Sequence, residues 1–507
     1  MASTCFTVTV RATSIMISNG EEAMYLLSTL IDNLTYEDEF AEDTRTLGFI
    51  YDKDTDTLFL HKGVDIEYLK RCLGNIKVKY DLYHPYKPMK FEYEEIIAPR
   101  NDEQVDVIDF IVGSGYHNNS NEPQIFLVKS PGFGKTFCSG VGLCKLKMKT
   151  LIVMHRDTLR RQWFNSLFNM NGLTENEVHE ITSTEELEAI AKGKLHLDYD
   201  VYLLTHATFR AGLNRIQKMK DVMNITKNLG IGLKIIDEAH LEFRDTLIMD
   251  FCFNVKRNLY LTATAGRSGK DENSIFRHVF SSAVFYKPSM LLTSNAPKKW
   301  VNYTTVEIDT HCKPNIYKYR VAGGKGMNGP SYGKWVIQYD KNHTHFKCIT
   351  DIIKLAFEKD QYSKILVFLP LIDLCEECAY FLKRKLDYDK DFTYDLDIRT
   401  ICSKNSKTDN EYAKKSDVII TTIQSCGTGT DIKGITTIIS CSPYVSKITC
   451  QQVFGRIRYN GKIGDYYDIY DASVPMDRFW LKSRNKTFKQ LALNVKHISW
   501  SDDEEEK

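Results

Sequence analysis

The chain has 507 residues, enough for about three domains that each bury their own core. Its 67 basic and 66 acidic side chains nearly cancel, so the overall charge does not by itself indicate a nucleic-acid-binding protein. The sequence shows neither a secretion signal nor an apolar run long enough to span a membrane, which predicts a cytoplasmic, reducing environment for its 13 cysteines.

Residues 1–95 are expected to form a small N-terminal α+β module, a candidate DNA-binding accessory. Phe6–Val10 and Thr57–Leu60 are short β-prone runs, and Ile66–Leu73 has a helical pattern. A stretch with two prolines at 85–88 marks the end of this module.

Residues 96–284 alternate short aliphatic strands with longer, more polar helical segments. This rhythm is typical of an α/β domain, in which a parallel sheet carries helices on both faces. The expected strands are Ile125–Val128, Leu151–Met154, Val201–Leu204, Leu233–Ile236 and Asn258–Leu261.

Residues 285–345 are rich in glycine and are expected to be a linker or insertion. Residues 346–498 resume the alternation and predict a second α/β domain, and residues 499–507 are expected to be a short, acidic, disordered tail. The strands expected in the second domain are Ile365–Phe368, Leu396–Arg399, Val418–Ile420, Thr437–Ser440 and Tyr466–Ile469.

A Gly-rich segment follows the first strand of the 96–284 domain and precedes a helical segment, the arrangement that surrounds a nucleotide's phosphates. Lys135 would place a positive charge on the β- and γ-phosphates, and Thr136 would offer a hydroxyl to Mg²⁺. A full P-loop has Gly six residues before this Lys, where the chain has Lys129. The residues of the candidate loop are Ser130, Pro131, Gly132, Phe133, Gly134, Lys135 and Thr136.

Two adjacent carboxylates, Asp237 and Glu238, come directly after the aliphatic strand at 233–236. Cleaving a phosphoanhydride requires a metal that spreads negative charge and a group that orients the attacking water. Asp237 is suited to hold Mg²⁺ and Glu238 to orient the water. An acidic turn is the plain alternative, but the position at a strand end favours the catalytic interpretation.

These motifs together resemble those of superfamily-2 helicases and translocases with the DEAH spelling. Leu261–Thr264 resembles the T-A-T motif, which links the nucleotide state to the grip on nucleic acid, and Gln162–Trp163 resembles a strand-end segment that contacts the nucleic-acid backbone. The resemblance implies nucleic-acid contact or coupling for Arg156, Thr205, His206, His240, Thr262, Thr264 and Thr422.

The second α/β domain carries segments that resemble motifs V and VI of the same family. Gly427–Asp431 resembles motif V, which implies nucleotide contact by Gly429 and Asp431. Gln452–Arg458 resembles motif VI, which implies catalytic roles for Gln452, Arg456 and Arg458. Either arginine could be the finger that neutralises the γ-phosphate, because Arg458 stands one position before the usual second Arg of the pattern.

Gln104 is a candidate reader of adenine. Family members often place a Gln upstream of the P-loop, and Gln104 lies upstream of Lys135 with an insertion between them. A solvent-exposed helix position is the alternative for this residue.

The resemblance implies an ATP hydrolase with two tandem RecA-like domains that uses ATP and Mg²⁺ to move along nucleic acid. It covers residues 100–475 and is nearest to compact phage and viral members, such as the branch-migration helicase of T-even phages and the transcript-release helicase of poxviruses. Duplex or branched DNA is the favoured track, followed by RNA–DNA hybrid or RNA. The alternatives are an ATP-gated binding switch, the motor subunit of a restriction-type nuclease, and a metabolic ATPase.

Overall fold

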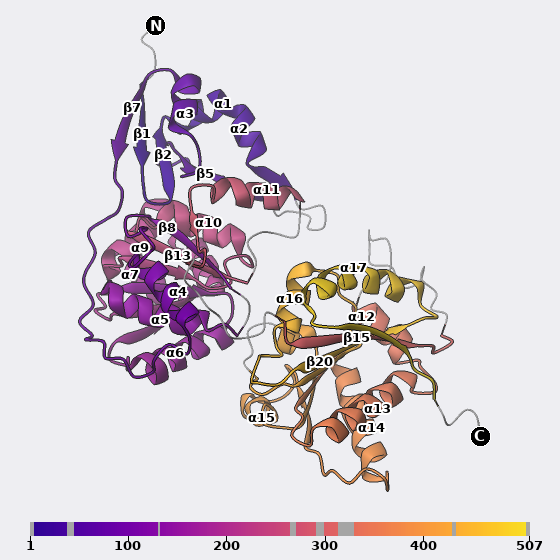
Figure 1. Ribbon diagram of the computed structural model, residues 1–507. Helices are drawn as coiled ribbons and strands as arrows, with labels where there is room; N and C mark the ends of the chain where they lie inside the picture. The colour runs from indigo at the N-terminus through magenta and orange to yellow at the C-terminus, as the bar shows by residue number, and fades with distance from the viewer. Residues whose placement is uncertain are drawn as a thin grey trace. The chain divides into compact units, whose positions relative to one another are not determined.

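The computed structural model describes residues 5–37, 45–129, 132–263, 270–289, 299–312, 329–427 and 432–502. It consists of two compact units, Met1–Ser294 and Asn295–Lys507, which Figure 1 colours from indigo to magenta and from orange to yellow. Within the described ranges no helix has the length and apolar character needed to cross a membrane.

The N-terminal module of the first unit is a five-stranded sheet in the order β5-β6-β2-β1-β7. Alternate residues of β1 are buried, and Phe6 and Val8 among them join residues of α1 and α3 in a small core of their own. The elements are β1 (Phe6–Val10), β2 (Ser14–Ser18), α1 (Gly20–Leu26), α2 (Ser28–Asn33), β3 (Thr35–Glu37), β4 (Arg45–Leu47), β5 (Phe49–Asp52), β6 (Thr57–His61), α3 (Ile66–Leu73) and β7 (Ile76–Tyr80).

A seven-stranded sheet follows, in the order β10-β11-β9-β12-β13-β8-β14, and all of its strand pairs are parallel. Its strands are β8 (Gln124–Val128), β9 (Thr150–Met154), β10 (Val178–Ile181), β11 (Val201–Thr205), β12 (Leu233–Ile236), β13 (Arg257–Thr262) and β14 (Val284–Phe285). Because all these strands run the same way, their carboxyl ends meet at one edge of the sheet.

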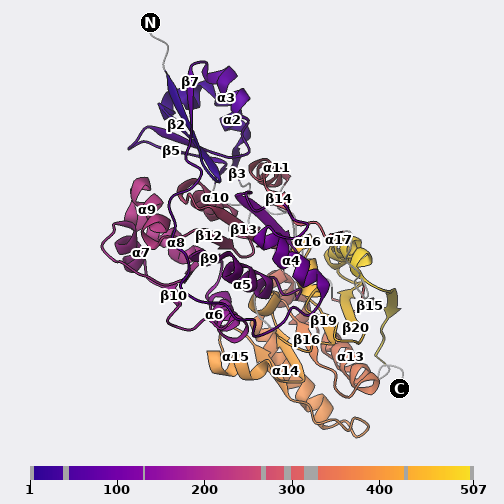
Figure 2. The ribbon, with the colours of Figure 1, turned by 60° about the vertical axis from the view of Figure 1, so that its left-hand side comes forward.

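Helices cover both faces of this sheet, as Figure 2 shows with α7, α8 and α9 on one side of the strands and α5 and α6 on the other. The helices are α4 (Asp102–Val112), α5 (Lys135–Leu146), α6 (Asp157–Asn171), α7 (Thr184–Ala191), α8 (His206–Ile216), α9 (Met219–Leu229), α10 (Phe243–Cys252) and α11 (Lys270–Val279). Neighbouring residues of one strand serve opposite cores, since Ile235 faces the α4–α6 side and Ile236 the α7–α11 side.

The N-terminal module is joined to this domain through the end of α10. The Arg11 guanidinium donates to the carbonyl oxygens of Phe251 (2.8 Å) and Cys252 (3.2 Å), and the Thr13 hydroxyl donates to the Asp250 carbonyl (2.6 Å). Because the last carbonyls of a helix have no partner within it, the β1–β2 turn supplies donors that α10 itself lacks.

The second unit contains another seven-stranded parallel sheet, in the order β17-β18-β16-β19-β20-β15-β21. Its strands are β15 (Val301–Ile308), β16 (Ile365–Phe368), β17 (Ile398–Ile401), β18 (Val418–Thr421), β19 (Thr437–Ser440), β20 (Gly464–Asp471) and β21 (Val495–Ser499).

In Figure 1, α13 and α14 lie on one side of β15 and β20, and α16 and α17 lie on the other. The helices are α12 (Gly329–Tyr332), α13 (Thr344–Lys359), α14 (Ile372–Asp387), α15 (Lys407–Ala413), α16 (Lys447–Phe454) and α17 (Pro475–Leu491), with π-helical turns at Gly333–Ile337 and Ile423–Gly427.

Two segments differ from their sequence-based interpretation. The expected linker 285–345 contains β15, which pairs along its whole length with β20, so part of it belongs to the second sheet. The expected disordered tail begins inside β21, and its Trp500 indole N–H donates to Asp351 (3.0 Å). The described residues of both segments pair with residues far away in the chain, which local composition does not show.

Candidate nucleotide site and its links to neighbouring elements

The described part of the Gly-rich loop turns sharply before α5. Gly132 and Gly134 have φ values of +80° and +99°, a region that residues with a Cβ rarely adopt. A Cβ on Gly134 would also lie 2.6 Å from Nε2 of Gln104. Lys135 and Thr136 are the first two residues of α5 and are half-buried. Ser130 and Pro131 lie outside the described residues.

Gln104 and Arg100 hold the loop from α4 and the residues before it. The Gln104 side chain donates to the Phe133 carbonyl (2.8 Å) and accepts from the Arg100 backbone N–H (2.9 Å). The Arg100 guanidinium donates to the carbonyls of Gly132 (3.0 Å) and Phe133. Both ends of the Gln104 amide therefore form hydrogen bonds within the protein. Arg100, which belongs to none of the sequence motifs, is the more exposed of the two side chains.

Lys129 replaces the first Gly of a full P-loop without filling the loop. Its ammonium pairs with Glu103 and lies 4.6 Å from the centre of the Tyr286 ring and 5.0 Å from that of the loop residue Phe133. Its carbonyl oxygen accepts a hydrogen bond from Nζ of Lys135 (2.9 Å). In this conformation the loop backbone holds the Lys135 ammonium in place.

Asp237 lies at the carboxyl edge of the same sheet and is held by Trp163 of α6. The Trp163 indole N–H donates to Oδ2 of Asp237 (2.8 Å), and the Glu238 backbone N–H donates to Oδ1 (3.0 Å). Trp163 is 1% exposed. The structure therefore corrects the expectation that Trp163 contacts nucleic acid, because the ring is inside the domain and points to the carboxylate.

Burial raises the pKa of Asp237 to about 6, and the neighbouring charge of Glu238 adds to this rise. The Trp163 hydrogen bond and the charge of Lys135 act in the opposite direction. Lys135 and Asp237 thus lie close enough to interact electrostatically, as a phosphate-binding lysine and a metal-binding carboxylate must.

The residues at this edge fit a magnesium ion. Asp237, Glu238 and Thr136 offer carboxylate and hydroxyl oxygens, which are the hard donors that Mg²⁺ prefers. Oε2 of Glu238 is buried without a hydrogen-bond partner in the described structure. The set is small, which suits an ion that keeps several waters and takes further oxygens from a nucleotide. Among the described residues no group of three or more His, Cys, Asp or Glu side chains has the arrangement of a metal site.

His240 and Thr262 connect the Asp-Glu turn to the next strand. Nδ1 of His240 lies 2.9 Å from the Thr262 hydroxyl and 3.4 Å from Oε2 of Glu238. Both His240 and Thr262 are buried. These contacts can transmit a change at the carboxylates to the end of β13. Thr264 lies outside the described residues.

Thr205 and His206 differ from the expected role of nucleic-acid contacts. The Thr205 hydroxyl accepts from the Thr208 N–H (3.1 Å) and caps α8, and Thr205 and His206 are 3% and 1% exposed. Burial also lowers the pKa of His206 to about 3, which leaves the ring neutral. Both side chains are internal in this conformation, and Arg156, at the same edge of the sheet, is the exposed one.

Arg210 links α8 to α10. Its guanidinium binds the buried carboxylate of Asp245 through Nε (3.1 Å) and Nη2 (2.6 Å), and Nη2 also binds Glu242 (2.6 Å). Helix α8 begins at a strand end beside the site, and α10 begins six residues after Asp237. No sequence motif pointed to this bridge, since it joins two segments by tertiary contact alone.

The second unit positions its own candidate residues around β18 and α16. Thr422 is buried directly after β18, and its hydroxyl donates to Ser425 (2.9 Å). Gln452 is buried within α16, while Arg456 and Arg458 follow the helix end and are half-buried and exposed, respectively. Gly429 and Asp431 lie outside the described residues.

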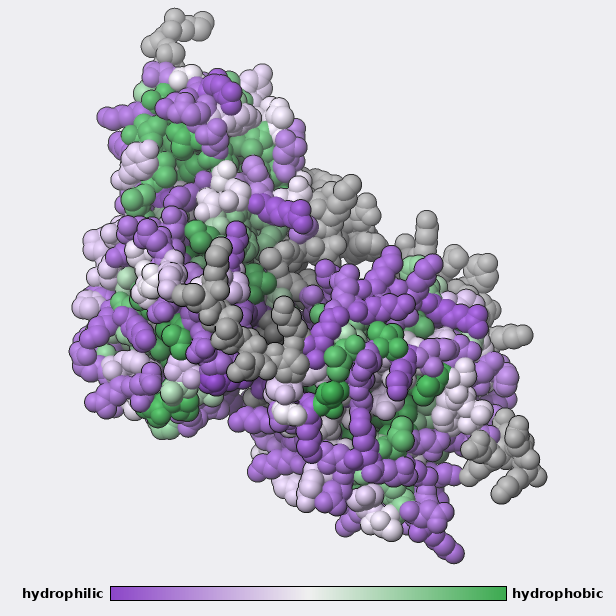
Figure 3. All heavy atoms as spheres, viewed as in Figure 1, coloured by the Kyte–Doolittle hydropathy of each residue, from purple (hydrophilic) through white to green (hydrophobic). Residues whose placement is uncertain are grey.

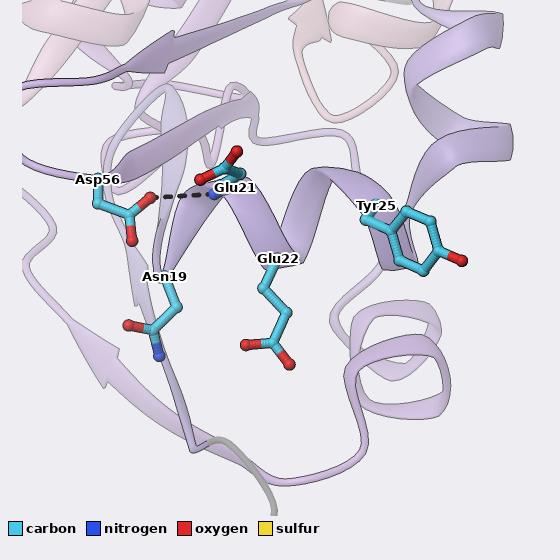
Figure 4. Close-up of a pocket in the computed structure, with 5 residues that line it drawn as sticks. All are labelled: Asn19, Glu21, Glu22, Tyr25 and Asp56. Atoms are coloured by element: carbon cyan, nitrogen blue, oxygen red, sulfur yellow. Dashed lines mark hydrogen bonds between the residues drawn. The ribbon is translucent and has the colours of Figure 1, made fainter.

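A separate hollow on the N-terminal module is acidic. Figure 4 shows Asn19, Glu21, Glu22, Tyr25 and Asp56 around it, with the Glu21 N–H donating to the Asp56 carboxylate (3.0 Å). Residues 1–95 contain 17 acidic and 10 basic residues. Three carboxylates would repel a triphosphate, so this hollow is not a second nucleotide site, and the charge of the module disfavours it as a nucleic-acid anchor.

Comparison with known proteins agrees with this arrangement. A family model described as "Type III restriction enzyme, res subunit" matches residues 89–267. The chain is 24% identical over 379 residues to the candidate helicase 161L of Invertebrate iridescent virus 6, covering 72% of this chain and 76% of that protein. It is 25% identical over 145 residues to the DNA 3'-5' helicase XPB of Kineococcus radiotolerans, covering 29% of this chain and 24% of that protein.

Two solved structures share the fold. Mss116p bound to ssRNA and AMP-PNP has a TM-score of 0.50 at 13% identity, covering 83% of this chain and 82% of its own. Dbp5 of S. cerevisiae bound to RNA and ADP BeF3 also has a TM-score of 0.50, at 12% identity, covering 80% of this chain and 91% of its own. The expected pair of RecA-like domains with a small N-terminal module is confirmed. The chain is thus similar to superfamily-2 helicases, viral members among them, which supports an ATP-dependent nucleic-acid helicase or translocase.

Proposed function

We propose that the protein is a DEAH-type ATPase that uses ATP and Mg²⁺ to move along or unwind DNA. The observation that carries the proposal is the convergence of Lys135 and Asp237 at one edge of the first parallel sheet, where the charge of Lys135 acts on the Asp237 carboxylate. Backbone N–H groups around Gly132 and Gly134, with the N-terminus of α5, would bind the phosphates.

Each residue has a chemical role in this proposal. Bound Mg²⁺ would neutralise charge on the β- and γ-phosphates. Asp237 and Thr136 would hold the ion, and the hydrogen bond from Trp163 fixes the orientation of the Asp237 carboxylate. Glu238, whose Oε2 has no hydrogen-bond partner in the described structure and lies 3.4 Å from Nδ1 of His240, would orient the attacking water.

Hydrolysis would be completed by the second RecA-like domain. Arg456 or Arg458 would stabilise the charge that develops on the γ-phosphate, and Gln452 would contact the nucleotide or the water. Gly429 and Asp431 are proposed to face the nucleotide, and Thr422 the nucleic acid.

DNA is the proposed track, with RNA–DNA hybrid and RNA as further candidates. The relative XPB is named as a DNA 3'-5' helicase, whereas Mss116p and Dbp5 are described as bound to RNA. XPB is similar to this chain in sequence, whereas Mss116p and Dbp5 are similar to it in fold alone, which favours DNA.

The test is ATP hydrolysis measured without nucleic acid and with single-stranded, duplex, forked and hybrid substrates. We expect stimulation by nucleic acid and its loss in Lys135→Ala. Lys145→Ala is the matched control, because Lys145 is exposed ten residues further along the same helix. If Lys135→Ala hydrolyses ATP at the parental rate, the site assignment is wrong.

Two further assays separate the alternatives. Strand displacement together with stimulated hydrolysis supports a helicase, whereas stimulation without displacement favours an ATP-gated switch or a translocase. Cleavage of DNA by the purified chain would favour the nuclease-motor alternative. Hydrolysis that no nucleic acid stimulates would favour a metabolic ATPase.

A further inference from the structure

Helix α17 has an unusual distribution of charge for a chain with nearly equal numbers of acidic and basic residues. Within Pro475–Leu491 there is one acidic residue, Asp477, and its side chain is buried, accepting from the Asp471 N–H and the Tyr332 hydroxyl (both 2.8 Å). The basic residues of the helix are Arg478, Lys482, Arg484, Lys486 and Lys489. The solvent face of α17 therefore has no carboxylate to offset its positive charge.

One face of α17 is fixed against the domain. Trp480, Arg484 and Phe488 recur every fourth residue and are buried. The Arg484 Nε lies 2.9 Å from Oδ2 of the buried Asp468 on β20. Breaking a buried ion pair is costly because it leaves a charge without a partner. This pair sets the rotation of α17 about its axis.

The remaining basic residues lie on the opposite face. Positions 478, 482 and 486 each precede or follow a buried anchor by two residues, which is a turn of about 200° around a helix. Arg478, Lys482, Lys486 and Lys489 are exposed and together form the basic stripe of α17. With a rise of about 1.5 Å per residue, the stripe extends for about 16 Å. Figure 3 shows a hydrophilic surface over α17.

The positive charges of the stripe are not neutralised within the described structure. None of its four residues forms an ion pair with another described residue, whereas basic residues elsewhere in this unit do, such as Lys354 with Asp389 and Lys404 with Asp373. An exposed cationic row of this kind raises the local concentration of anions.

We propose that the basic stripe of α17 binds the phosphate backbone of the nucleic acid on which the motor acts. The proposal rests on the proposed function. It adds a contact surface beyond the residues that the sequence motifs assign to nucleic-acid contact. Flexible lysines bind phosphates without reading bases, which suits a protein that moves along any sequence. Phe479, 63% exposed beside Arg478, offers an aromatic ring next to the stripe.

A membrane surface fits the same charge less well. A helix that lies in a lipid interface needs an exposed apolar face opposite its basic one. The apolar face of α17 is already packed in the domain, where Phe488 stacks on Phe454 of α16 with ring centres 5.3 Å apart. Helix α16 packs against α17 and ends just before Arg456. A nucleic-acid strand bound to α17 would therefore be separated from the candidate arginine finger by one helix.

The experiment uses the full chain with Lys482→Glu/Lys486→Glu. The matched control is Lys383→Glu/Lys390→Glu, the same change of charge at two exposed positions on and just after α14, which covers the other face of the sheet. Binding of labelled duplex and single-stranded DNA is measured by fluorescence anisotropy across a salt series, with the thermal midpoint as a check of folding.

We expect the stripe variant to bind DNA at least ten-fold more weakly than the control at low salt. The slope of log K against log salt should fall by about 1.8, since each phosphate contact contributes about 0.9. A stripe variant that binds like the control overturns the proposal, provided that the parent binds DNA and is stimulated by it. A parent that no nucleic acid binds or stimulates instead contradicts the proposed function. Selective loss of binding to phosphatidylserine vesicles, with DNA binding intact, would assign the stripe to a membrane and also overturn the proposal.

Discussion

Nε1 of Trp163 lies 2.8 Å from Oδ2 of Asp237 and donates a hydrogen bond to it inside the first parallel-sheet domain. The ring belongs to α6, which begins just beyond the end of β9, and the carboxylate stands at the end of the neighbouring strand β12. The helix that follows one strand therefore orients the proposed metal ligand on the next. Partners of this kind tune metal affinity although they never touch the ion.

Trp163→Phe should weaken the use of Mg²⁺ while keeping the ring in the core. Loss of such an outer partner commonly costs ten- to a hundred-fold in metal affinity, so we expect the Mg²⁺ concentration for half-maximal ATP hydrolysis to rise about ten-fold. The control is Trp300→Phe, which removes an indole donor to the Ile457 carbonyl in the other unit (2.9 Å). Identical Mg²⁺ curves for the two variants would contradict the assigned role.

Asp237→Asn should stabilise the protein at neutral pH although it removes activity. The pKa of Asp237 is about 6 in the folded chain against an ordinary value of 3.8, so the folded state binds the extra proton. In the wild type, the contribution of the Asp237 carboxyl to the free energy of unfolding is therefore greatest below pH 4. It is lost as the pH rises through 6 and the carboxyl ionises.

The amide that Asp237→Asn introduces does not ionise, so the variant avoids this loss. We expect it to gain on the order of 2 kcal/mol in the free energy of unfolding at pH 7.5, and the gain to shrink as pH falls through 6. Urea unfolding in EDTA at pH 7.5 and pH 4.5 measures both values. A difference that does not depend on pH would show that Asp237 does not titrate in this range.

Arg210→Gln should uncouple nucleic acid from hydrolysis. The substitution breaks the bridge from α8 to Asp245 and Glu242 on and before α10, and it leaves the Asp245 carboxylate buried with a weaker partner. We expect the stimulation factor, the ratio of rates with and without nucleic acid, to fall several-fold. Arg215→Gln is the control, because Arg215 on the same helix pairs with Glu185 and Glu188 of α7 instead. Equal stimulation factors in both variants would argue against coupling through α10.

Arg11→Met, a substitution in the N-terminal module, should lower the free energy of unfolding of the first unit. Arg11 is buried and donates to the last carbonyls of α10, and Met fills similar space without a donor. Each buried acceptor left unpaired costs about 1–3 kcal/mol, and Arg11 serves two of them, so we expect a loss of about 2–6 kcal/mol in the free energy of unfolding, measured in urea. Arg71→Met, at an exposed position on α3, should change little. If both variants unfold alike, the N-terminal module contributes no stability through α10.

Much of the strand pattern followed from the sequence. Ile365–Phe368 and Thr437–Ser440 form strands with the expected bounds, because continuous aliphatic runs between polar segments occur mainly in buried parallel strands. The expected strands did not include β10 and β14 of the first parallel sheet, β15 and β21 of the second, or β2, β3, β4, β5 and β7 of the N-terminal module. β10 and β21 contain charged or polar residues, and β15 lies in a region whose glycines predicted a linker.

The sequence by itself determined which residues stand next to the ends of strands and helices: the Gly-rich loop before α5, the Asp237-Glu238 pair after β12 and the arginines after α16. It could do so because each motif is local and directly follows or precedes an aliphatic run. Tertiary structure alone decided what those residues touch. Trp163 and Asp237 are 74 residues apart in the chain, and Arg11 and Phe251 are 240 apart. It also decided that Thr205 and His206 are internal and that the lysines of α17 face solvent, because burial depends on which faces pack together.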